Sequence, residues 1–338
     1  MRELELSDPH LNHLPPVGET PLVEVEGIRA KLECANPCGS IKDRIGRYIL
    51  EESRRRGLLL PGQRIVEATS GNTGIALAHF GRLLGHPVTI VMPESMTEER
   101  KSILRSLGAD LVLSSAEGSF AEAAAIRDRL ALEHGWFNPD QFSNPLNVEC
   151  HELTTGAELV RQLADRPIDA FVAGIGTGGT LIGIGRALRR VHPAVRLVAV
   201  EPEESAVLSG GPPGDHGISG IGDGFVPAIA SDGRGGIHPE IDEVAQVSTP
   251  EAIAAARRLA EVHGLCVGIS SGANFVVAAR LTARGLAVAT VFADGFTKYR
   301  SRGLVPCQPG HCPFEHELDL PAPQGSAGAG PRVRCRDL

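Results

Sequence analysis

A single lysine stands in the segment Asn36-Pro37-Cys38-Gly39-Ser40-Ile41-Lys42-Asp43-Arg44, a short Gly/Ser loop that we expect to join a strand at residues 30–33 to a helix starting near Arg44. A lysine at such a junction can be partly desolvated, which lowers its pKa and leaves a neutral amine able to form a Schiff base. Most lysines, however, are solvated surface charges. The meaning of Lys42 therefore depends on the motifs that follow it along the chain.

The alternation of short apolar runs with helical patterns predicts the fold class. Strands rich in Val, Ile and Leu, each followed by a helix, indicate an α/β protein with mostly parallel sheets covered on both faces. The expected strands are residues 64–67, 88–92, 111–113, 170–173, 197–200 and 287–292; the expected helices are residues 73–84, 97–107, 120–133, 155–163, 180–191, 250–262 and 273–283. Two such series, which divide near residue 150, predict two doubly wound units with a ligand cleft between them.

Three further segments lie outside these series. Residues 20–26 and 29–33 have the pattern of a hairpin that turns at Gly27. Residues 210–238, rich in Gly, Pro and Asp, indicate a long loop of the kind that is usually functional or disordered. Residues 321–338 begin with a low-complexity run, and we expect this tail to be disordered.

Composition excludes several classes of function. The chain has 338 residues, which favours two domains, and its 42% hydrophobic and 22% charged residues are ordinary for a soluble protein. A formal net charge of −8 and only 4% aromatic residues argue against a nucleic-acid partner. No apolar window reaches the ~18 residues of a membrane span. Seven cysteines spread over a long chain without a signal peptide favour the cytoplasm.

A glycine-rich loop follows the strand expected at residues 170–173: Gly174-Ile175-Gly176-Thr177-Gly178-Gly179-Thr180. Glycines let the backbone turn so tightly that several N–H groups converge on an anion at the start of the next helix. A plain strand-to-helix turn would also use glycine. The clustering here favours a phosphate site.

The glycine loop alone does not identify the ligand that carries this phosphate. Gly174, Gly176 and Gly179 have the spacing of the dinucleotide fingerprint, and Glu201 follows the next strand where a ribose-binding acid would be expected. A nicotinamide-dependent dehydrogenase is therefore one alternative. The additional Gly178 and Thr180 suit a compact monophosphate site at least as well.

Two more loops carry small polar residues at strand-to-helix junctions. Thr69-Ser70-Gly71-Asn72-Thr73-Gly74 has more hydroxyl and amide side chains than a helix cap requires, and it could bind a carboxylate at a helix N-terminus. Gly268-Ile269-Ser270-Ser271-Gly272-Ala273 offers two serines, either of which could simply cap a helix. A lysine, a phosphate loop, a carboxylate loop and a serine together suggest pyridoxal phosphate.

In this combination the chain resembles the cysteine synthase / cystathionine β-synthase family, most of all its cysteine synthase (O-acetylserine sulfhydrylase) branch. These are pyridoxal-phosphate-dependent enzymes with the tryptophan-synthase-β-like fold, known as fold type II. The resemblance runs in order through about residues 15 to 300. Its motifs are Gly18-Glu19-Thr20-Pro21-Leu22, residues 36–44 and 67–74, Met92-Pro93-Glu94, Gln141-Phe142-x-Asn144-Pro145, Thr154-Thr155-Gly156, residues 174–180, Gly220-Ile221-Gly222-x-Gly224-Phe225-Val226-Pro227 and residues 268–272.

The resemblance implies a role for each matching residue. Lys42 would carry the Schiff base, Asn72 would bind the ring hydroxyl, and Ser270 would face the pyridine nitrogen. The phosphate would be bound by Gly176, Thr177, Gly178, Gly179 and Thr180. The substrate would be held by Thr69, Ser70, Gly71, Thr73, Gln141 and Gly222. Residues 1–46 and 153–320 would form a larger cofactor domain, residues 47–152 a smaller mobile domain, and the cofactor would lie in the cleft between them.

The implied reaction is β-replacement on an activated L-serine, either O-acetylserine or O-phosphoserine, through an aminoacrylate intermediate. Lys42 would act as the general base at Cα, and the ring would absorb the charge. Sulfide as nucleophile would give L-cysteine. Homocysteine, as in cystathionine β-synthases, or an amine, as in diaminopropionate synthesis, would be alternatives, and so would a catalytically silent binding relative. The resemblance further implies a cytoplasmic homodimer with a small amino-acid substrate.

Several residues depart from the family pattern. Cys38 replaces the more usual Thr or Gly, Asp223 stands where cysteine synthases usually have Ala, and residues 294–299 differ from the usual segment. Lys298 or Arg300 could favour a phosphorylated donor. Cys34 and Cys38 flank the lysine loop and could act as redox groups, although small buried cysteines are commoner. Cys307, His311, Cys312 and His316 lack typical zinc spacing, so we expect no metal site.

Overall fold

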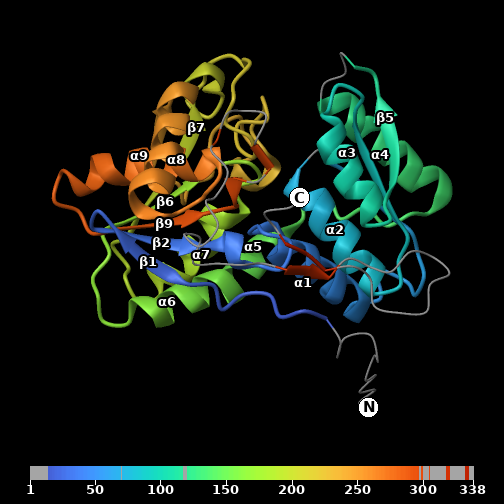
Figure 1. Cartoon of the computed structure of the whole chain (residues 1–338), viewed down its shortest axis with the longest axis horizontal. Helices are drawn as coiled ribbons and strands as arrows, with labels where there is room; N and C mark the ends of the chain where they lie inside the picture. Colours follow the sequence, from blue (N-terminus) through green and yellow to red (C-terminus); the bar gives the residue numbers. More distant parts are fainter. Residues whose placement is uncertain are drawn as a thin grey trace, which may run out of the picture. The chain divides into compact units, whose positions relative to one another are not determined.

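The computed structural model describes residues 14–69, 71–116, 120–296, 298–299 and 304, together with the backbone alone of residues 317–319 and 332–334. The chain divides into two compact units. The first is built on Gly46–Pro139 and the second on Gly18–Ile45 and Asp140–Asp319. Each unit has a sheet of its own (Figure 1).

The first unit contains a parallel three-stranded sheet in the order β3-β4-β5. Its strands are short apolar runs, and Val66, Ala68 and Val91 form a buried cluster with Ala123 of helix α4. The elements are β3 (Ile65–Ala68), α2 (Asn72–Leu83), β4 (Val88–Pro93), α3 (Glu98–Ser106), β5 (Asp110–Ser114), α4 (Phe120–His134) and the part of α1 (Lys42–Arg55) that follows Ile45.

The second unit contains a six-stranded sheet in the order β1-β2-β9-β6-β7-β8. The expected hairpin forms its edge, since β1 pairs antiparallel with β2 and every other neighbouring pair is parallel. The strands are β1 (Leu22–Val25), β2 (Ile28–Leu32), β6 (Ala170–Gly174), β7 (Arg196–Pro202), β8 (Glu243–Val247) and β9 (Val288–Phe292). The helices are α5 (Pro145–His151), α6 (Ala157–Leu163), α7 (Gly179–Arg189), α8 (Thr249–His263) and α9 (Ile269–Thr282), with short turns η2 (Glu33–Ala35), η4 (Glu203–Ser205) and η5 (Ala228–Ala230).

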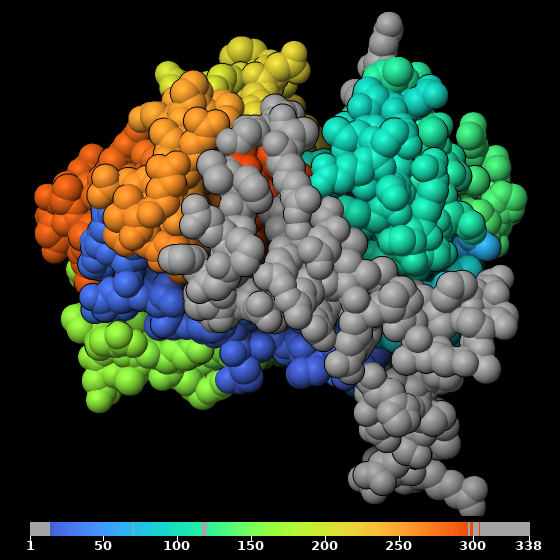
Figure 2. All heavy atoms as spheres, in the orientation of Figure 1, coloured from blue at the N-terminus to red at the C-terminus, as the bar shows by residue number. Residues whose placement is uncertain are grey.

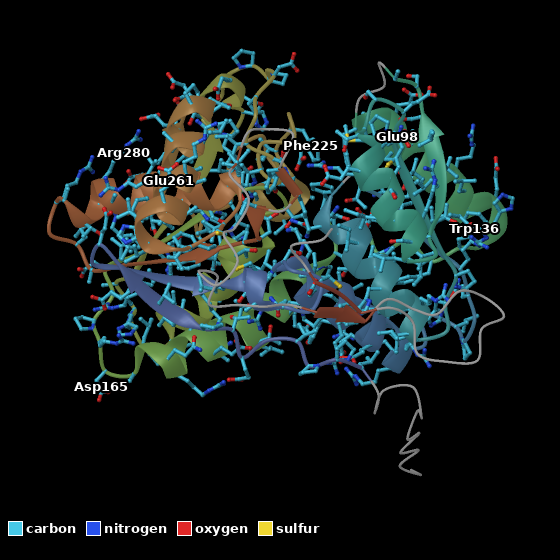
Figure 3. All side chains as sticks on the ribbon, viewed as in Figure 1. Glu98, Trp136, Asp165, Phe225, Glu261 and Arg280 are labelled. Carbon is cyan, nitrogen blue, oxygen red and sulfur yellow. The ribbon has the colours of Figure 1, made fainter. Side chains whose placement is uncertain are left out.

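Both faces of this sheet are buried, as the apolar strand pattern predicted. Helices α8 and α9 contribute to one core cluster with alternate residues of β2, β6 and β7, such as Val172 and Val198. Helices α6 and α7 contribute to a second cluster with the intervening residues of the strands, which point to the opposite face, such as Phe171 and Leu197. Figure 1 shows the two pairs of helices on opposite sides of the strands, and Figure 2 shows the outer side of α8 on the molecular surface. The unit is therefore a doubly wound α/β layer.

One continuous helical rod links α5 to α6. Asn144 caps its start by accepting a hydrogen bond from Leu146 N at 3.0 Å, and Pro145 occupies the first turn. Between the two helices the residues Glu152–Gly156, labelled η3, form a wider π-helical turn. Sequence analysis expected only the second half of this rod, because α5 is seven residues long and mixes polar with apolar residues. Single π-turns inside helices are rare and often occur near functional sites.

Other differences from expectation concern edges and ends. Strand β8 was not predicted, because only its last residue is fully buried. Helix α9 begins at Ile269, earlier than residue 273. In the tail that we expected to be disordered, strand β11 (Arg332–Arg334) pairs antiparallel with β10 (Glu317–Asp319). The rest of that tail lies outside the described residues. No described helix has both the length and the apolar character needed to cross a bilayer.

Four buried charges fasten the start of helix α1 to the second unit. Arg44 donates to both oxygens of Glu33, at 2.6 and 2.8 Å, and to both oxygens of Glu158, at 2.7 and 2.8 Å. Lys31 forms an ion pair with Glu158 at 2.9 Å, and all four side chains are at most 7% exposed. Burial alone would raise the pKa of Glu158, but Arg44 and Lys31 outweigh it and lower that pKa to about 2. The two cations and two carboxylates balance within this buried network.

We predict that Glu158→Gln lowers the free energy of unfolding by about 3–5 kcal/mol at neutral pH, because Arg44 and Lys31 are left buried with one counter-charge. Since the pKa of Glu158 is depressed, its stabilisation is present above about pH 4.3 and is lost as the pH falls towards 2. Urea unfolding followed by circular dichroism measures both effects. The control is Glu19→Gln, which breaks the exposed pair with Arg161 and should cost less than about 1 kcal/mol. Equal losses for the two variants would contradict the prediction.

Candidate functional site

Lys42 is the first residue of helix α1, and its backbone is held from both sides. Ser40 Oγ accepts from Lys42 N at 3.2 Å, and Ile41 N donates to Ala293 O at 2.8 Å. Its side chain is only partly exposed and makes no hydrogen bond or ion pair with a described residue. Burial lowers the pKa of the Lys42 amine, although Asp223 and Asp294 oppose this shift. The structure thus presents an uncommitted amine whose neutral form is favoured.

The glycine loop lies between the end of β6 and the start of α7. Gly178 has φ 91°, a left-handed conformation that side chains rarely adopt, so glycine is required there. A Cβ on Gly176 would lie 2.5 Å from Gly220 O, which shows how closely the loop packs on residues 220–225. The N-terminus of α7 and the backbone amides of the loop form a site suited to an anion.

Two polar residues on α5 hold the threonines of this loop. Asn147 Nδ2 donates to Thr177 Oγ1 at 3.0 Å and to Gln141 O at 2.8 Å. His151 lies 2.9 Å from Thr155 Oγ1 through Nδ1 and 3.3 Å from Thr180 Oγ1 through Nε2. Sequence analysis did not identify Asn147 or His151, because their role depends on contacts with a loop about 30 residues away.

His151 remains neutral at physiological pH. It is fully buried, and burial, with smaller effects from Lys42 and Arg44, lowers its pKa well below the usual value. A neutral ring adds no positive charge beside the anion-binding loop and offers Thr180 one defined hydrogen-bond partner. Lys42 therefore acts electrostatically on His151, whose ring contacts Thr180 of the glycine loop.

The serine loop meets the lysine loop at one backbone position. Ser271 Oγ accepts from Ala293 N at 3.0 Å, while Ala293 O accepts from Ile41 N. Ser270, in the first turn of α9, is 5% exposed, and its hydroxyl has no partner among the described residues. The second unit therefore contains Lys42, Ser270 and the 174–180 loop. Asn147 links Gln141 O to Thr177, and Gly222 N donates to Ile175 O at 3.0 Å.

The remaining predicted substrate residues lie in the first unit, between β3 and α2. Gly71 N donates to Thr69 Oγ1 at 3.3 Å, and Thr69 and Thr73 are 7% and 5% exposed. Asn72 begins helix α2, and Ser70 lies outside the described residues. The predicted roles of these residues in substrate and cofactor binding stay predictions.

Glu201 does not serve as a ribose-binding acid. It is 1% exposed, and its carboxylate accepts hydrogen bonds from Leu208 N and from the amide and hydroxyl of Ser209. Both oxygens are thus committed to the loop that follows β7. The glycine spacing at 174–179 therefore lacks the partner that a dinucleotide requires.

Four of the cysteines lie among the described residues, whereas the suggested metal ligands do not. Cys34, Cys38, Cys150 and Cys266 are free thiols, and Cys38 is 1% exposed. No group of His, Cys, Asp and Glu side chains suited to a metal occurs among the described residues. Cys307, His311, Cys312 and His316, like Arg300, lie outside them.

The geometry of the second unit suits an aldehyde cofactor with a phosphate. An amine is available at the start of α1, amides converge at the start of α7, and Ser270 presents a hydroxyl from α9. Such an arrangement is that of a pyridoxal-phosphate enzyme on an α/β fold.

Comparisons with known proteins agree. Residues 13–292 match the family described as pyridoxal-phosphate dependent enzyme, and the chain belongs to this family. The cysteine synthase of Staphylococcus aureus is 42% identical over 300 residues, 85% of this chain and 94% of that protein. O-Acetyl serine sulfhydrylase isoform 3 of Entamoeba histolytica has a TM-score of 0.80 with 36% identity, covering 92% of this chain and 95% of that one. The O-acetylserine dependent cystathionine beta-synthase of Helicobacter pylori has a TM-score of 0.79 with 37% identity, covering 85% and 96%.

The protein is therefore a pyridoxal-phosphate-dependent enzyme of fold type II, as the sequence motifs predicted. Its own residues fit the cofactor: within the part of the chain that the structure describes, Lys42 and Ser270 have no competing partner, and the tight approach of Gly176 to Gly220 leaves no room for a side chain at position 176. The cofactor supplies an aldehyde for the amine and an electron sink for a carbanion at Cα.

We predict that Asn147→Ala weakens pyridoxal phosphate binding about tenfold, because Thr177 loses the amide that orients its hydroxyl. Titration of the cofactor-free protein, followed by absorbance, gives the dissociation constant. Asn138→Ala is the control, since Asn138 bonds Asp128 in the first unit. A dissociation constant that is the same for both variants would show that Asn147 does not support the loop.

A pH dependence is predicted from Asp43, which follows Lys42 and accepts from Cys38 N at 2.5 Å. Burial raises the pKa of Asp43 to about 7. The folded protein thus holds this proton more tightly than the unfolded chain, so its stabilisation is complete below about pH 4 and is lost as the pH rises to about 7. The unfolding free energy of wild type minus that of Asp43→Asn should fall across this interval, by up to about 4 kcal/mol. Urea unfolding at a series of pH values measures this difference. A difference that does not change with pH would contradict the prediction.

Proposed function

We propose that this enzyme replaces the β-substituent of an activated L-serine, O-acetylserine or O-phosphoserine, with sulfide to form L-cysteine. The observation that carries the proposal is the amine of Lys42, which makes no hydrogen bond or ion pair with a described residue and lies in the same unit as the anion-binding loop at residues 174–180. The printed activities of similar proteins, cysteine synthase and O-acetyl serine sulfhydrylase, support the same reaction.

Lys42 is the residue that moves the proton at Cα. Its amine would hold the cofactor's aldehyde in the resting enzyme, and its lowered pKa favours the neutral form that a general base requires. The proton taken from Cα is later returned from the same nitrogen. Ser270 offers a neutral hydroxyl towards the pyridine nitrogen, which favours β-elimination over chemistry that needs a protonated ring.

We assign the substrate carboxylate to the loop that precedes α2. Thr69, Gly71 and Thr73 supply hydroxyls and backbone amides at the start of α2, which suit a carboxylate, and Ser70, outside the described residues, keeps its predicted role. Gln141 and Gly222 complete the substrate set, and Asn72 binds the ring hydroxyl. We assign the cofactor to the larger unit and substrate-induced movement to the smaller one.

The donor is more consistent with O-acetylserine than with O-phosphoserine. Lys298 Nζ donates to Cys38 O at 3.2 Å, so its ammonium is engaged with the backbone of the lysine loop. It is therefore not held ready for the phosphate of a phosphorylated donor. The donor of the Helicobacter pylori relative is also O-acetylserine.

Compartment and assembly follow from the resemblance. We propose a cytoplasmic homodimer, and the four free thiols among the described residues support a reducing compartment. Replacement with homocysteine is the second candidate reaction, which the similarity to the O-acetylserine dependent cystathionine beta-synthase of Helicobacter pylori supports, and an amine acceptor stays an alternative beside it.

The test begins with the cofactor. The purified protein should be yellow, and borohydride should bleach it while tagging Lys42, as located by peptide mass spectrometry. Lys42→Ala should lose the tag and lower the rate of β-replacement by at least ~10³-fold, because general base and covalent attachment are both removed. O-acetylserine, O-phosphoserine and serine are then compared with sulfide as acceptor. Absence of cysteine with every donor would refute the proposed reaction.

A further inference from the structure

A histidine in the long loop that follows β7 uses both of its ring nitrogens to hold the backbone. His216 is half-buried. Ile218 N donates to its Nδ1 at 3.2 Å, which assigns the ring proton to Nε2, and Nε2 donates to Gly222 O at 2.8 Å. The imidazole therefore closes a hydrogen-bonded turn that runs from residue 216 to residue 222.

The backbone beside His216 is anchored on helix α8. Gly217 N donates to Thr249 Oγ1 at 2.8 Å, and Thr249, the first residue of α8, donates through its own N to Glu204 Oε1 at 2.7 Å. Ile218 is fully buried in the core cluster to which α8 contributes. The ring is thus carried by a segment fixed to a rigid element, and it can hold another segment in place.

Gly222 is the residue that the ring holds, and it lies directly on the glycine loop. Its N donates to Ile175 O at 3.0 Å, while its O accepts from His216. With φ at 69° and no side chain to pack, Gly222 has more conformational freedom than any other residue type would have. Its position therefore depends on these two backbone hydrogen bonds.

Other residues hold the threonines of the glycine loop. Asn147 and His151 of α5 contact Thr177 and Thr180, as described above. Loss of the imidazole of His216 would leave those contacts in place. Gly222 itself would lose one of its two hydrogen bonds to described residues, so the effect falls on residue 222 and not on the supports of the phosphate site.

We propose that His216 is a positioning residue for the amino-acid donor, because its Nε2–H keeps Gly222 docked on the glycine loop. The inference rests on the proposed function, in which Gly222 belongs to the substrate set. His216 moves no proton of the reaction. Its loss therefore weakens donor binding and leaves the proton transfers of Lys42 unchanged.

Two substitutions separate the two nitrogens of the ring. The side-chain amide of His216→Gln reaches as far as Nε2 and can donate to Gly222 O. The shorter side chain of His216→Asn replaces only Nδ1, as the acceptor for Ile218 N. His216→Asn should weaken donor binding roughly tenfold, and His216→Gln should restore it to within about threefold of wild type.

Donor binding is measured without turnover. L-Alanine has no β-substituent to lose, and its dissociation constant from the cofactor-loaded protein is read from the change in cofactor absorbance. The KM for O-acetylserine should follow this constant, while kcat with sulfide and the dissociation constant of pyridoxal phosphate should change less than about twofold. His238→Asn is the matched control, since His238 Nδ1 accepts from Glu240 N at 3.2 Å in the same kind of local turn.

A second readout tests the contact itself. Exchange of the Gly222 amide hydrogen, which bonds Ile175 O, is followed by NMR in the protein without an amino-acid ligand. His216→Asn should accelerate this exchange roughly tenfold, because residue 222 opens more often, and His216→Gln should not.

The outcomes are distinguishable. Equal effects of the two substitutions on alanine binding, or losses of kcat and cofactor affinity as large as the loss of donor affinity, would mean that His216 only supports the fold. Unchanged binding and exchange in His216→Asn would mean that the contact positions nothing. Either result overturns the inference. Wild type that binds alanine but forms no cysteine from any donor would refute the proposed β-replacement, while the alanine constants and exchange rates would still test His216.

Discussion

The bidentate contacts of Arg44 with Glu33 and Glu158 are the constraint on which the site depends. Arg44 lies two residues after Lys42, on the first turn of the same helix, so the buried network fixes where that helix begins and how it is turned. A surface pair could not do this, because exposed ion pairs contribute little and are easily rearranged. Buried and fully paired, the network allows no alternative geometry without stranding a charge. The amine of Lys42 is therefore positioned by residues that take no part in its chemistry.

The site follows a common pattern in which structural polar groups are satisfied and reactive ones are not. Hydrogen bonds from the protein engage the polar groups of three supporting residues: Glu201 binds the loop after β7, and His151 and Asn147 bind threonines of the glycine loop. Lys42 and Ser270, in contrast, have none of their side-chain capacity used by described residues. A polar group left without a partner costs folding free energy, so it is kept where a ligand will supply the missing partner. The contrast distinguishes the binding groups from the supporting ones.

Much of the fold could be predicted because its strands are continuous apolar runs. Strands β4, β6 and β9 could be predicted in this way. Strand β8 is half-exposed and contains Glu243 and Gln246, so it is recognised as a strand only from its pairing with β7. The lysine and glycine loops were also predictable, since their residue types follow from local backbone and anion chemistry. The network around Arg44 was not, because Arg44 and Glu158 are 114 positions apart. Nor could the sequence show that the carboxylate of Glu201 accepts hydrogen bonds from Leu208 and Ser209. This engagement is what distinguishes a monophosphate-binding loop from a dinucleotide-binding one here.

The π-helical turn at Glu152–Gly156 connects the helix that supports the glycine loop to the helix that carries Glu158 of the buried ion-pair network. His151, before the turn, faces Thr180, and Glu158, after the turn, faces Arg44. His151 and Glu158 nevertheless belong to one uninterrupted helical rod. An ordinary helix advances about 100° per residue, so the extra residue accommodated by the π-turn sets the rotational phase between the two faces. Deleting one residue there would swing the carboxylate away from its cations by more than a quarter of a revolution. The length of this helix is therefore set by the two contacts that it must present, a constraint that an exposed loop does not carry.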